Sequence, residues 1–238
     1  MLIESAYDAQ LSRTRGRPLV RGVVSPAVVF SFVCVTGLLG TASLGCTGRM
    51  TAWLGVGNMF LYAGVYTPLK RWSIVNTWVG AVVGAVPPLM GWSARTGGDL
   101  MGHGGGWVLA GIVYAWQFPH FNALSWGFRE EYARTGYRMM CVTHPALNAR
   151  VALRYSLWCL VLCWALPMTG LLDRFYLVDS TVVNAFMAIY AWRFYRHPCA
   201  KSARELFFAS LVHLPSVFLL ALAHKILALW RTQYTLHG

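Results

Sequence analysis

A single uncharged stretch decides the fold class of this chain: Val23-Val-Ser-Pro-Ala-Val-Val-Phe-Ser-Phe-Val-Cys-Val-Thr-Gly-Leu-Leu-Gly-Thr-Ala-Ser-Leu-Gly-Cys46. About 20 such residues are enough for an α-helix to cross a bilayer. Lipid cannot hydrogen-bond an exposed backbone, so a spanning segment must be a helix or part of a closed barrel. Because the residues of a barrel strand alternate in polarity and these do not, the stretch predicts a transmembrane helix.

Six further stretches have the same apolar character. Together with the first, they predict transmembrane helices at roughly 23–46, 50–67, 73–92, 106–128, 151–171, 175–195 and 205–230. The composition agrees, because 57% of the residues are hydrophobic and only 12% are charged, whereas a soluble domain is roughly a quarter charged. The sequence therefore predicts an all-α integral membrane protein, folded as a single membrane-embedded domain over residues 1–238.

The basic residues indicate an orientation. Most of the 20 Lys and Arg residues lie in or beside the loops 9–22, 68–72, 129–150 and 193–204. The opposite loops and the tail hold Arg49, Arg95, Arg174, Lys225 and Arg231. The positive-inside rule places the basic loops on one side of the membrane, and it accounts for the net charge of +12. We therefore expect the lipid bilayer, and not a nucleic acid, as the large partner.

The N-terminal segment carries the first candidate site. Glu4 and Asp8 are four residues apart, so both carboxylates project from one face of a helix. Arg13, Arg15 and Arg17 follow closely. Carboxylates suit a hard cation such as Mg²⁺, and arginines bind phosphate oxygens, so the segment is typical of a site for a Mg²⁺–diphosphate. A helix end with solvated charges, followed by arginines that only set the orientation, explains the same spacing.

Two further charged segments fall on the same predicted side. One mixes acids and bases: Arg129, Glu130, Glu131, Arg134 and Arg138. A second carboxylate group opposite the first would let metal ions bridge one diphosphate. In the other segment Pro68 ends the second span, which leaves Lys70 and Arg71 able to turn back over the site. Ordinary cationic loops with local ion pairs explain both patterns equally well.

Polar side chains recur inside the predicted spans. His120 and His213 each lie about eight residues from the basic end of their helix, roughly 12 Å deep. Further polar residues fall in or near the same half of the membrane: Asn58, Asn76, Gln117, Asn122 and Asn184. Because unpaired polar groups are costly in lipid, they indicate a polar-lined cavity open to the basic face; hydrogen bonds between helices are the alternative. Pro87-Pro88 and Pro119 are expected to break the helices beside this cavity.

Three blocks in this order resemble one known family. They are Ser12-Arg-Thr-Arg-Gly-Arg-Pro-Leu-Val-Arg21, Tyr66-Thr-Pro-Leu-Lys-Arg-Trp-Ser-Ile-Val-Asn-Thr-Trp-Val-Gly-Ala-Val-Val-Gly-Ala-Val-Pro-Pro-Leu-Met-Gly-Trp92, and Trp116-Gln-Phe-Pro-His-Phe-Asn-Ala-Leu-Ser-Trp126 followed by Arg129-Glu-Glu-Tyr132. On these blocks the chain resembles the protohaem IX farnesyltransferase (haem O synthase) family, a branch of the UbiA-type intramembrane prenyltransferases. The middle and third blocks are closer to the mitochondrial branch than to the bacterial one.

The resemblance implies a UbiA-type helical bundle, an activity and a set of partners. Enzymes of this family transfer a farnesyl group from farnesyl diphosphate to a vinyl group of protohaem IX (haem B), giving haem O on the way to haem A for cytochrome c oxidase. The implied cofactor is Mg²⁺, and haem A synthase is an implied downstream partner. The implied location is the mitochondrial inner membrane, with the active face toward the matrix, or the plasma membrane for a bacterial protein.

The same resemblance assigns roles to residues. Glu4 and Asp8 match the second and third members of the family's first acidic motif; the first member would precede Met1, so we expect this chain to lack the family's first helix and most of its second. The expected metal ligands are Glu4, Asp8 and Glu131, and the expected catalytic residues are Asp8, Lys70, Arg71 and Glu131. The expected substrate-binding residues are Arg13, Arg17, Tyr66, Asn76 and Asn122, together with His120 and His213, which are added from their depth in the predicted helices and not from the resemblance.

Two other functions fit part of the pattern. A quinone-type aromatic prenyltransferase would share the acidic motifs, although the block from Tyr66 to Trp92 argues against it. A non-catalytic membrane protein that handles haem, such as a carrier or an assembly partner, would need the polar cavity but not the acidic residues. The mass of the prenylated product distinguishes the two enzymes, and haem binding without turnover would indicate the third function.

Overall fold

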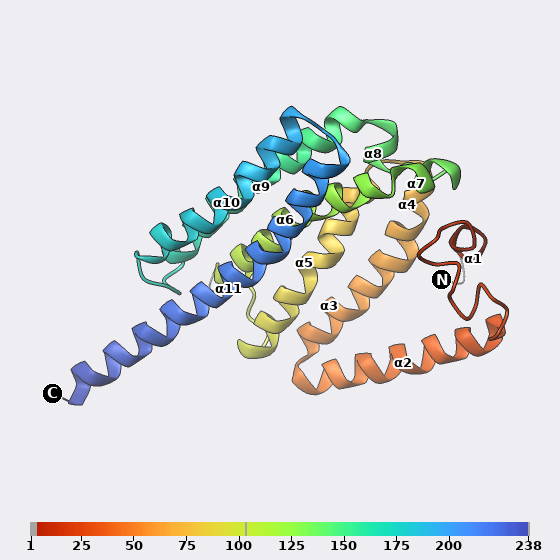
Figure 1. Ribbon diagram of the computed structural model, residues 1–238. Coiled ribbons are helices and arrows are strands. Elements are labelled where there is room, and N and C mark those ends of the chain that lie inside the picture. Colours follow the sequence, from red (N-terminus) through yellow and green to blue (C-terminus); the bar gives the residue numbers. More distant parts are fainter. Residues whose placement is uncertain (1–3, 103, 238) are drawn as a thin grey trace.

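The computed structural model describes residues 4–102 and 104–237, with side chains described as far as Trp230. The run Met1–Ile3, which leads into the first acidic motif, lies outside the described residues. All the secondary-structure elements of the described chain are helices, joined by turns and irregular segments (Figure 1). The elements in order are α1 (Ser5–Asp8), α2 (Pro26–Thr47), α3 (Arg49–Phe60), the π-helix η1 (Leu61–Tyr66), α4 (Thr67–Trp72), α5 (Asn76–Arg95), α6 (Gly105–Gly127), α7 (Arg129–Arg134), α8 (Met140–Thr143), α9 (Pro145–Met168), α10 (Tyr176–Arg196) and α11 (Ala200–His237).

The prediction of an all-α chain is confirmed, and each predicted span falls on a helical element. Among the described residues, three helices are long and apolar enough to cross a membrane by length and composition. They are Pro26–Thr47, Pro145–Met168 and Ala200–Trp230. The predicted span 50–67 is shared between α3, η1 and the start of α4.

Five long helices form the body of the structure. Helix α6 packs against α5, α9 and α11, and α10 packs against both α9 and α11. Figure 1 shows α4, α7, α8 and the connection between α10 and α11 at one end of this bundle. The basic loops that the sequence assigns to one side of the membrane therefore lie at one end of the structure.

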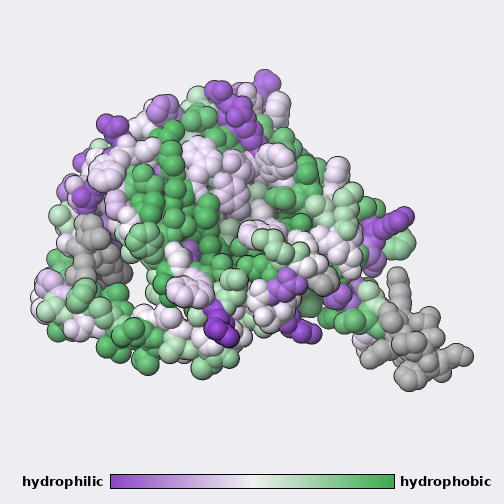
Figure 2. All heavy atoms as spheres, turned by 180° about the vertical axis from the view of Figure 1, so that it is seen from behind, coloured by the Kyte–Doolittle hydropathy of each residue, from purple (hydrophilic) through white to green (hydrophobic). Residues whose placement is uncertain are grey.

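Large apolar side chains cover the outside of the bundle. Phe30, Trp53, Trp158, Val182 and Leu219 are each more than half exposed. On the face drawn in Figure 2, hydrophobic residues spread over a broad surface below an upper rim where hydrophilic residues gather. Apolar surface costs about 25 cal/mol per Å² in water, so this arrangement is typical of a surface that faces lipid.

Helix α2 is the least supported of the long helices. Within the part of the chain that the structure describes, no residue of α2 is buried. It packs against α3 and runs across the edge of the bundle instead of alongside the other long helices (Figure 1).

The expectation that Pro68 ends the second span is wrong, because the helix continues past Pro68 into α4 and only changes its register just before this proline. Pro68 has no N–H for the carbonyl of Gly64, and in an α-helix its ring would clash with that carbonyl. The wider π-turn of η1 removes the clash, and the Thr67 hydroxyl donates to the carbonyl of Tyr62 at 2.9 Å. As a result the rings of Tyr62 and Tyr66 lie together, with centroids 5.5 Å apart.

The expectation that Pro87-Pro88 and Pro119 break their helices is wrong. Helices α5 and α6 run through these prolines without interruption. Each internal proline removes one backbone hydrogen bond, and packing against neighbouring helices compensates for that loss in a membrane bundle.

Buried polar side chains join the long helices. The Asn122 amide donates to the carbonyl of Asn148 at 2.9 Å, and the Asn148 amide donates back to the carbonyl of Asn122 at 3.1 Å. These two bonds join α6 to α9. His213 Nε2 donates to Asn184 Oδ1 at 3.0 Å and joins α11 to α10. Hydrogen bonding between helices, the alternative considered for the polar residues in the spans, is therefore confirmed for Asn122, Asn184 and His213.

Replacing both Asn122 and Asn148 by Ala should lower the free energy of unfolding by about 1–2 kcal/mol, because two hydrogen bonds between helices are lost where water cannot replace them. Thermal unfolding in detergent, followed by circular dichroism, measures the effect. The control is Ser216→Ala, since the exposed Ser216 hydroxyl bonds only within its own helix. Equal losses in the two proteins would contradict the assignment.

Candidate active site

A polar pocket of about 250 Å³ lies at the basic end of the bundle. The N-terminal segment, η1, α4 and the connection between α7 and α8 form its walls. Its charged lining residues are Glu4, Asp8, Arg13, Arg17 and Lys70. Three cations outnumber two carboxylates, so the pocket favours an anion.

Glu4 ties the start of the chain to two distant segments. It is 7% exposed and accepts a hydrogen bond from Lys70 Nζ at 3.0 Å and from the Tyr137 hydroxyl at 3.4 Å. Burial, together with the neighbouring carboxylates of Glu4 and Asp8, raises the pKa of Tyr137 above its ordinary value. The Tyr137 hydroxyl therefore remains protonated and acts as a donor.

Asp8 is held by the turn that follows it. Arg17 donates to Asp8 Oδ2 at 2.6 Å, and the Thr14 hydroxyl donates to the backbone carbonyl of Asp8 at 2.8 Å. Arg17 is about one third exposed, whereas Asp8 is almost fully buried. The turn therefore places arginines beside the two carboxylates without a long helix.

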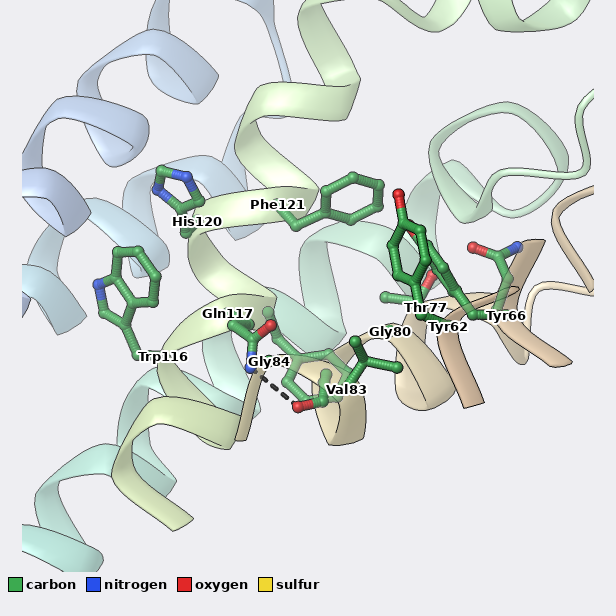
Figure 3. Close-up of a pocket in the computed structure, with 13 residues that line it drawn as sticks. Tyr62, Tyr66, Thr77, Gly80, Val83, Gly84, Trp116, Gln117, His120 and Phe121 are labelled. Carbon is green, nitrogen blue, oxygen red and sulfur yellow. Dashed lines mark hydrogen bonds between the residues drawn. The ribbon is translucent and has the colours of Figure 1, made fainter. Parts of the chain in front are cut away.

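An apolar cavity of about 320 Å³ lies between η1, α5 and α6 (Figure 3). Glycines on α5 leave room for two of the side chains that line it. A Cβ atom on Gly80 would lie 2.7 Å from the ring of Tyr66, and a Cβ atom on Gly84 would overlap the side-chain amide of Gln117. Gln117 itself donates to the carbonyl of Ala81 at 2.9 Å, the bond drawn dashed in Figure 3.

The polar pocket and the apolar cavity share a wall of three aromatic side chains. Tyr62, Tyr66 and Phe121 line both spaces. Lys70 Nζ lies 4.6 Å from the centre of the Tyr66 ring, so a cation of the polar pocket is in contact with this wall. A ligand with an anionic head and an apolar tail matches the two adjoining spaces.

His120 and Trp116 lie on the other side of the apolar cavity from these tyrosines (Figure 3). His120 Nδ1 is 2.9 Å from the Ser210 hydroxyl, and the His120 ring stacks on Trp116 with centroids 4.5 Å apart. Trp116 also donates to the backbone carbonyl of Ser210 at 2.7 Å. These contacts fix both rings between α6 and α11.

Most of the predicted site residues come together. The polar pocket includes Glu4, Asp8, Arg13, Arg17, Lys70 and Tyr66, and the apolar cavity includes Tyr66, Asn76 and His120. The remaining predicted residues lie elsewhere. The Arg71 guanidinium is 3.8 Å from the centre of the Tyr7 ring, and Asn122 and His213 lie in the helix interfaces described above.

Glu131 binds the N-terminal segment instead of facing the polar pocket. Its Oε2 accepts from the backbone N–H of Ser12 at 3.0 Å, and its Oε1 accepts from the Ser12 hydroxyl at 2.6 Å. These two hydrogen bonds hold the pKa of Glu131 below its ordinary value. Among the described side chains, no group of three His, Cys, Asp or Glu residues is placed to hold a metal ion, so the expected trio of Glu4, Asp8 and Glu131 is not assembled.

Glu4 and Asp8 still fit a magnesium ion that arrives with a substrate. Mg²⁺ is commonly held by one or two carboxylates together with substrate phosphates and water. Glu4 and Asp8 supply two hard oxygen donors in one pocket, where Lys70 and Arg17 pair with them and Arg13 adds a third cation for phosphate oxygens.

Sequence reasoning missed Tyr62, Tyr137 and Ser12. Tyr62 precedes Tyr66 by one helical turn, so the spacing itself places the two rings on one face. Tyr137 and Ser12 carry no comparable signal, because their positions depend on how two loops fold against each other.

Comparison with known proteins agrees with this architecture. The model of the UbiA prenyltransferase family matches residues 1–225. The chain is 50% identical over 237 residues to a protein named protoheme IX farnesyltransferase, mitochondrial, from Yarrowia lipolytica, covering 93% of this chain and 50% of the relative. The protein of the same name from Homo sapiens is 49% identical over 223 residues, covering 93% of this chain and 50% of the relative.

The chain therefore belongs to the UbiA prenyltransferase family. The resemblance found in the sequence is confirmed, since the relatives carry the name of the branch that the three sequence blocks indicate. The chain spans about half the length of the curated relatives it matches. No solved structure matches it.

Replacing Glu131 by Gln should release the N-terminal segment, because an amide presents only one acceptor to the two Ser12 donors. We expect faster trypsin cleavage after Arg13 and Arg15 at neutral pH, measured by mass spectrometry. Folding lowers the pKa of Glu131. In the unmodified protein, the hydrogen bonds between Glu131 and Ser12 therefore stabilise the segment fully above the ordinary carboxyl pKa of about 4.3. This stabilisation is lost as the pH falls through the lowered pKa.

The matched control is Glu130→Gln, which removes the same charge from the adjacent position. Cleavage that rises equally in both variants would show that local charge, and not the contact with Ser12, governs the segment.

Proposed function

We propose that this protein transfers a farnesyl group from farnesyl diphosphate to a vinyl group of protohaem IX, with addition of water, to give haem O. The observation that carries the proposal is the adjoining pair of spaces: a cation-rich polar pocket and an apolar cavity that share an aromatic wall. The name of the relatives supports the choice of donor and acceptor.

The residues of the polar pocket would promote loss of the diphosphate. When the bond between C1 of the farnesyl group and oxygen breaks, the electron pair leaves with the diphosphate. Arg13, Arg17 and Lys70 would bind the negative charge that develops, which is electrostatic stabilisation of the transition state. Mg²⁺, when held by Glu4 and Asp8, would neutralise further charge on the phosphates.

The aromatic wall would stabilise the farnesyl cation. The allylic cation forms at the boundary of the two spaces, where Tyr62, Tyr66 and Phe121 lie. Aromatic faces attract cations, most strongly where water is excluded. The haem vinyl group then supplies the electrons of the new carbon–carbon bond, and water adds to the cation left on the haem side chain and loses a proton.

The remaining roles follow the same scheme. We propose that Asn76 and His120 position substrate from the walls of the apolar cavity, and that Arg71 and Glu131 act by holding the N-terminal segment over the pocket. All seven predicted segments would cross the mitochondrial inner membrane, with the basic end toward the matrix. Haem A synthase would then use the product on the way to cytochrome c oxidase.

Lys70→Ala should lower the rate of haem O formation by about 10²–10³-fold, the range for loss of one group that stabilises developing charge. Conversion of haem B to haem O in the presence of farnesyl diphosphate and Mg²⁺, followed by mass spectrometry, measures the rate. Arg95→Ala is the control, because Arg95 lies at the end of α5 far from the polar pocket. Haem binding without any product in the unmodified protein would instead support a haem-handling function.

The membrane arrangement makes a separate prediction about two exposed cysteines. Cys46 and Cys199 should lie on opposite sides of the membrane, since an odd number of spans separates the ends of α2 and α10. In sealed vesicles, single-cysteine proteins treated with a membrane-impermeant maleimide should react from opposite sides. Labelling of both cysteines from the same side would contradict the seven-span arrangement.

A further inference from the structure

A third space, separate from the polar pocket and the apolar cavity, lies where the end of α6 meets the start of α11. This groove has a volume of about 620 Å³, within the range of about 300–1,000 Å³ for small-molecule sites. Phe128 and Phe207 form apolar walls, and Lys201 and Arg204 are its charged residues. Both cations are exposed, and among the described residues that line the groove none is acidic.

The groove adjoins both parts of the candidate active site. Arg13 of the polar pocket lies over the ring of Phe128, with 5.8 Å from its guanidinium carbon to the ring centre. His120 of the apolar cavity lies against Phe207, with ring centroids 4.9 Å apart. One aromatic contact therefore separates the groove from each of the other spaces.

The groove is charged at the basic end of the bundle and apolar farther inside. Lys201 and Arg204 lie in the first turns of α11 at the basic end of the bundle, whereas Phe207 and Ala123 lie deeper in their helices. A ligand that matches this arrangement carries its negative charge at one edge and is otherwise flat or apolar. The small residues Gly127, Ala200 and Ala203 leave the space between the two helices open.

We propose that this groove binds the acceptor, with Lys201 and Arg204 pairing with the two propionates of haem B. The proposal rests on the proposed function, because it is the acceptor of that reaction that needs a site. The apolar cavity, at about 320 Å³, is at the lower limit of small-molecule sites. It has room for an isoprenoid chain but not for a macrocycle in addition. Haem carries its vinyl groups on the edge opposite the propionates, so propionates at the rim direct the vinyl edge inward.

The test compares haem B with its dimethyl ester, in which the propionate charges are absent. Both are titrated, by absorbance, into the full chain in nanodiscs of neutral phosphatidylcholine, and the ratio of the two affinities is determined. We expect the unmodified protein to prefer haem B by about tenfold, which corresponds to about 1.4 kcal/mol. In K201Q/R204Q the ratio should fall to about one.

The matched control is R150Q/R196Q. Arg150 and Arg196 line a different groove at the basic end, between α9 and α10, so this variant should keep the tenfold preference. The ratio is internal to each sample and does not depend on the fraction of folded protein. If K201Q/R204Q binds neither ligand, the single variants Lys201→Gln and Arg204→Gln are titrated, each with an expected loss of about threefold.

Two results would overturn the proposal: an unchanged ratio in K201Q/R204Q, and an equal loss in R150Q/R196Q. If the unchanged ratio is accompanied by loss of bound phosphatidylglycerol in mixed nanodiscs, the occupant of the groove is an anionic lipid. Haem O formation by the unmodified protein is measured separately, so a failure of this site and a failure of the proposed function give different results.

Discussion

Burying a carboxylate costs several kcal/mol unless a cation and hydrogen bonds accompany it. The candidate site meets this requirement for two buried carboxylates. Glu4 and Asp8 are both almost fully buried. Lys70 reaches Glu4 from α4, and Arg17 reaches Asp8 from the same N-terminal segment. The pair of Lys70 and Glu4 brings two segments that are distant in the sequence to one pocket, whereas the pair of Arg17 and Asp8 holds the N-terminal turn together. Arg13 lies beside both pairs as an additional positive charge.

The aromatic wall links this electrostatic pocket to the apolar cavity. Pro68 disfavours a continuous α-helix, and the π-turn that precedes it presents Tyr62 and Tyr66 together. Gly80 on the facing helix leaves room for the Tyr66 ring. The π-turn and the absence of a side chain at Gly80 therefore together place the rings of Tyr62 and Tyr66 at the boundary between the polar pocket and the apolar cavity.

The sequence predicted the features that depend on composition and short spacing. Long uncharged runs predict the helices, and basic loops predict which ends lie together. The four-residue spacing of Glu4 and Asp8 correctly placed both in one pocket. Contacts that depend on loop conformation were beyond this reasoning: Glu131 was expected at the metal, yet it binds Ser12. The bonds between Asn122 and Asn148 could not be predicted either. A polar residue in a predicted span can line a cavity or join two helices, and its polarity alone does not distinguish the two.

In the proposed reaction, one extended substrate occupies the polar pocket with its head and the apolar cavity with its tail. A farnesyl diphosphate analogue with a photoreactive group at the far end of its chain tests this directly when the attachment sites are mapped by mass spectrometry. We expect attachment to α5 and α6 around Val83, Gly84 and Gln117, which line the apolar cavity. Attachment mainly to the lipid-facing side chains of α2 or α10, with the cavity residues unmodified, would contradict it.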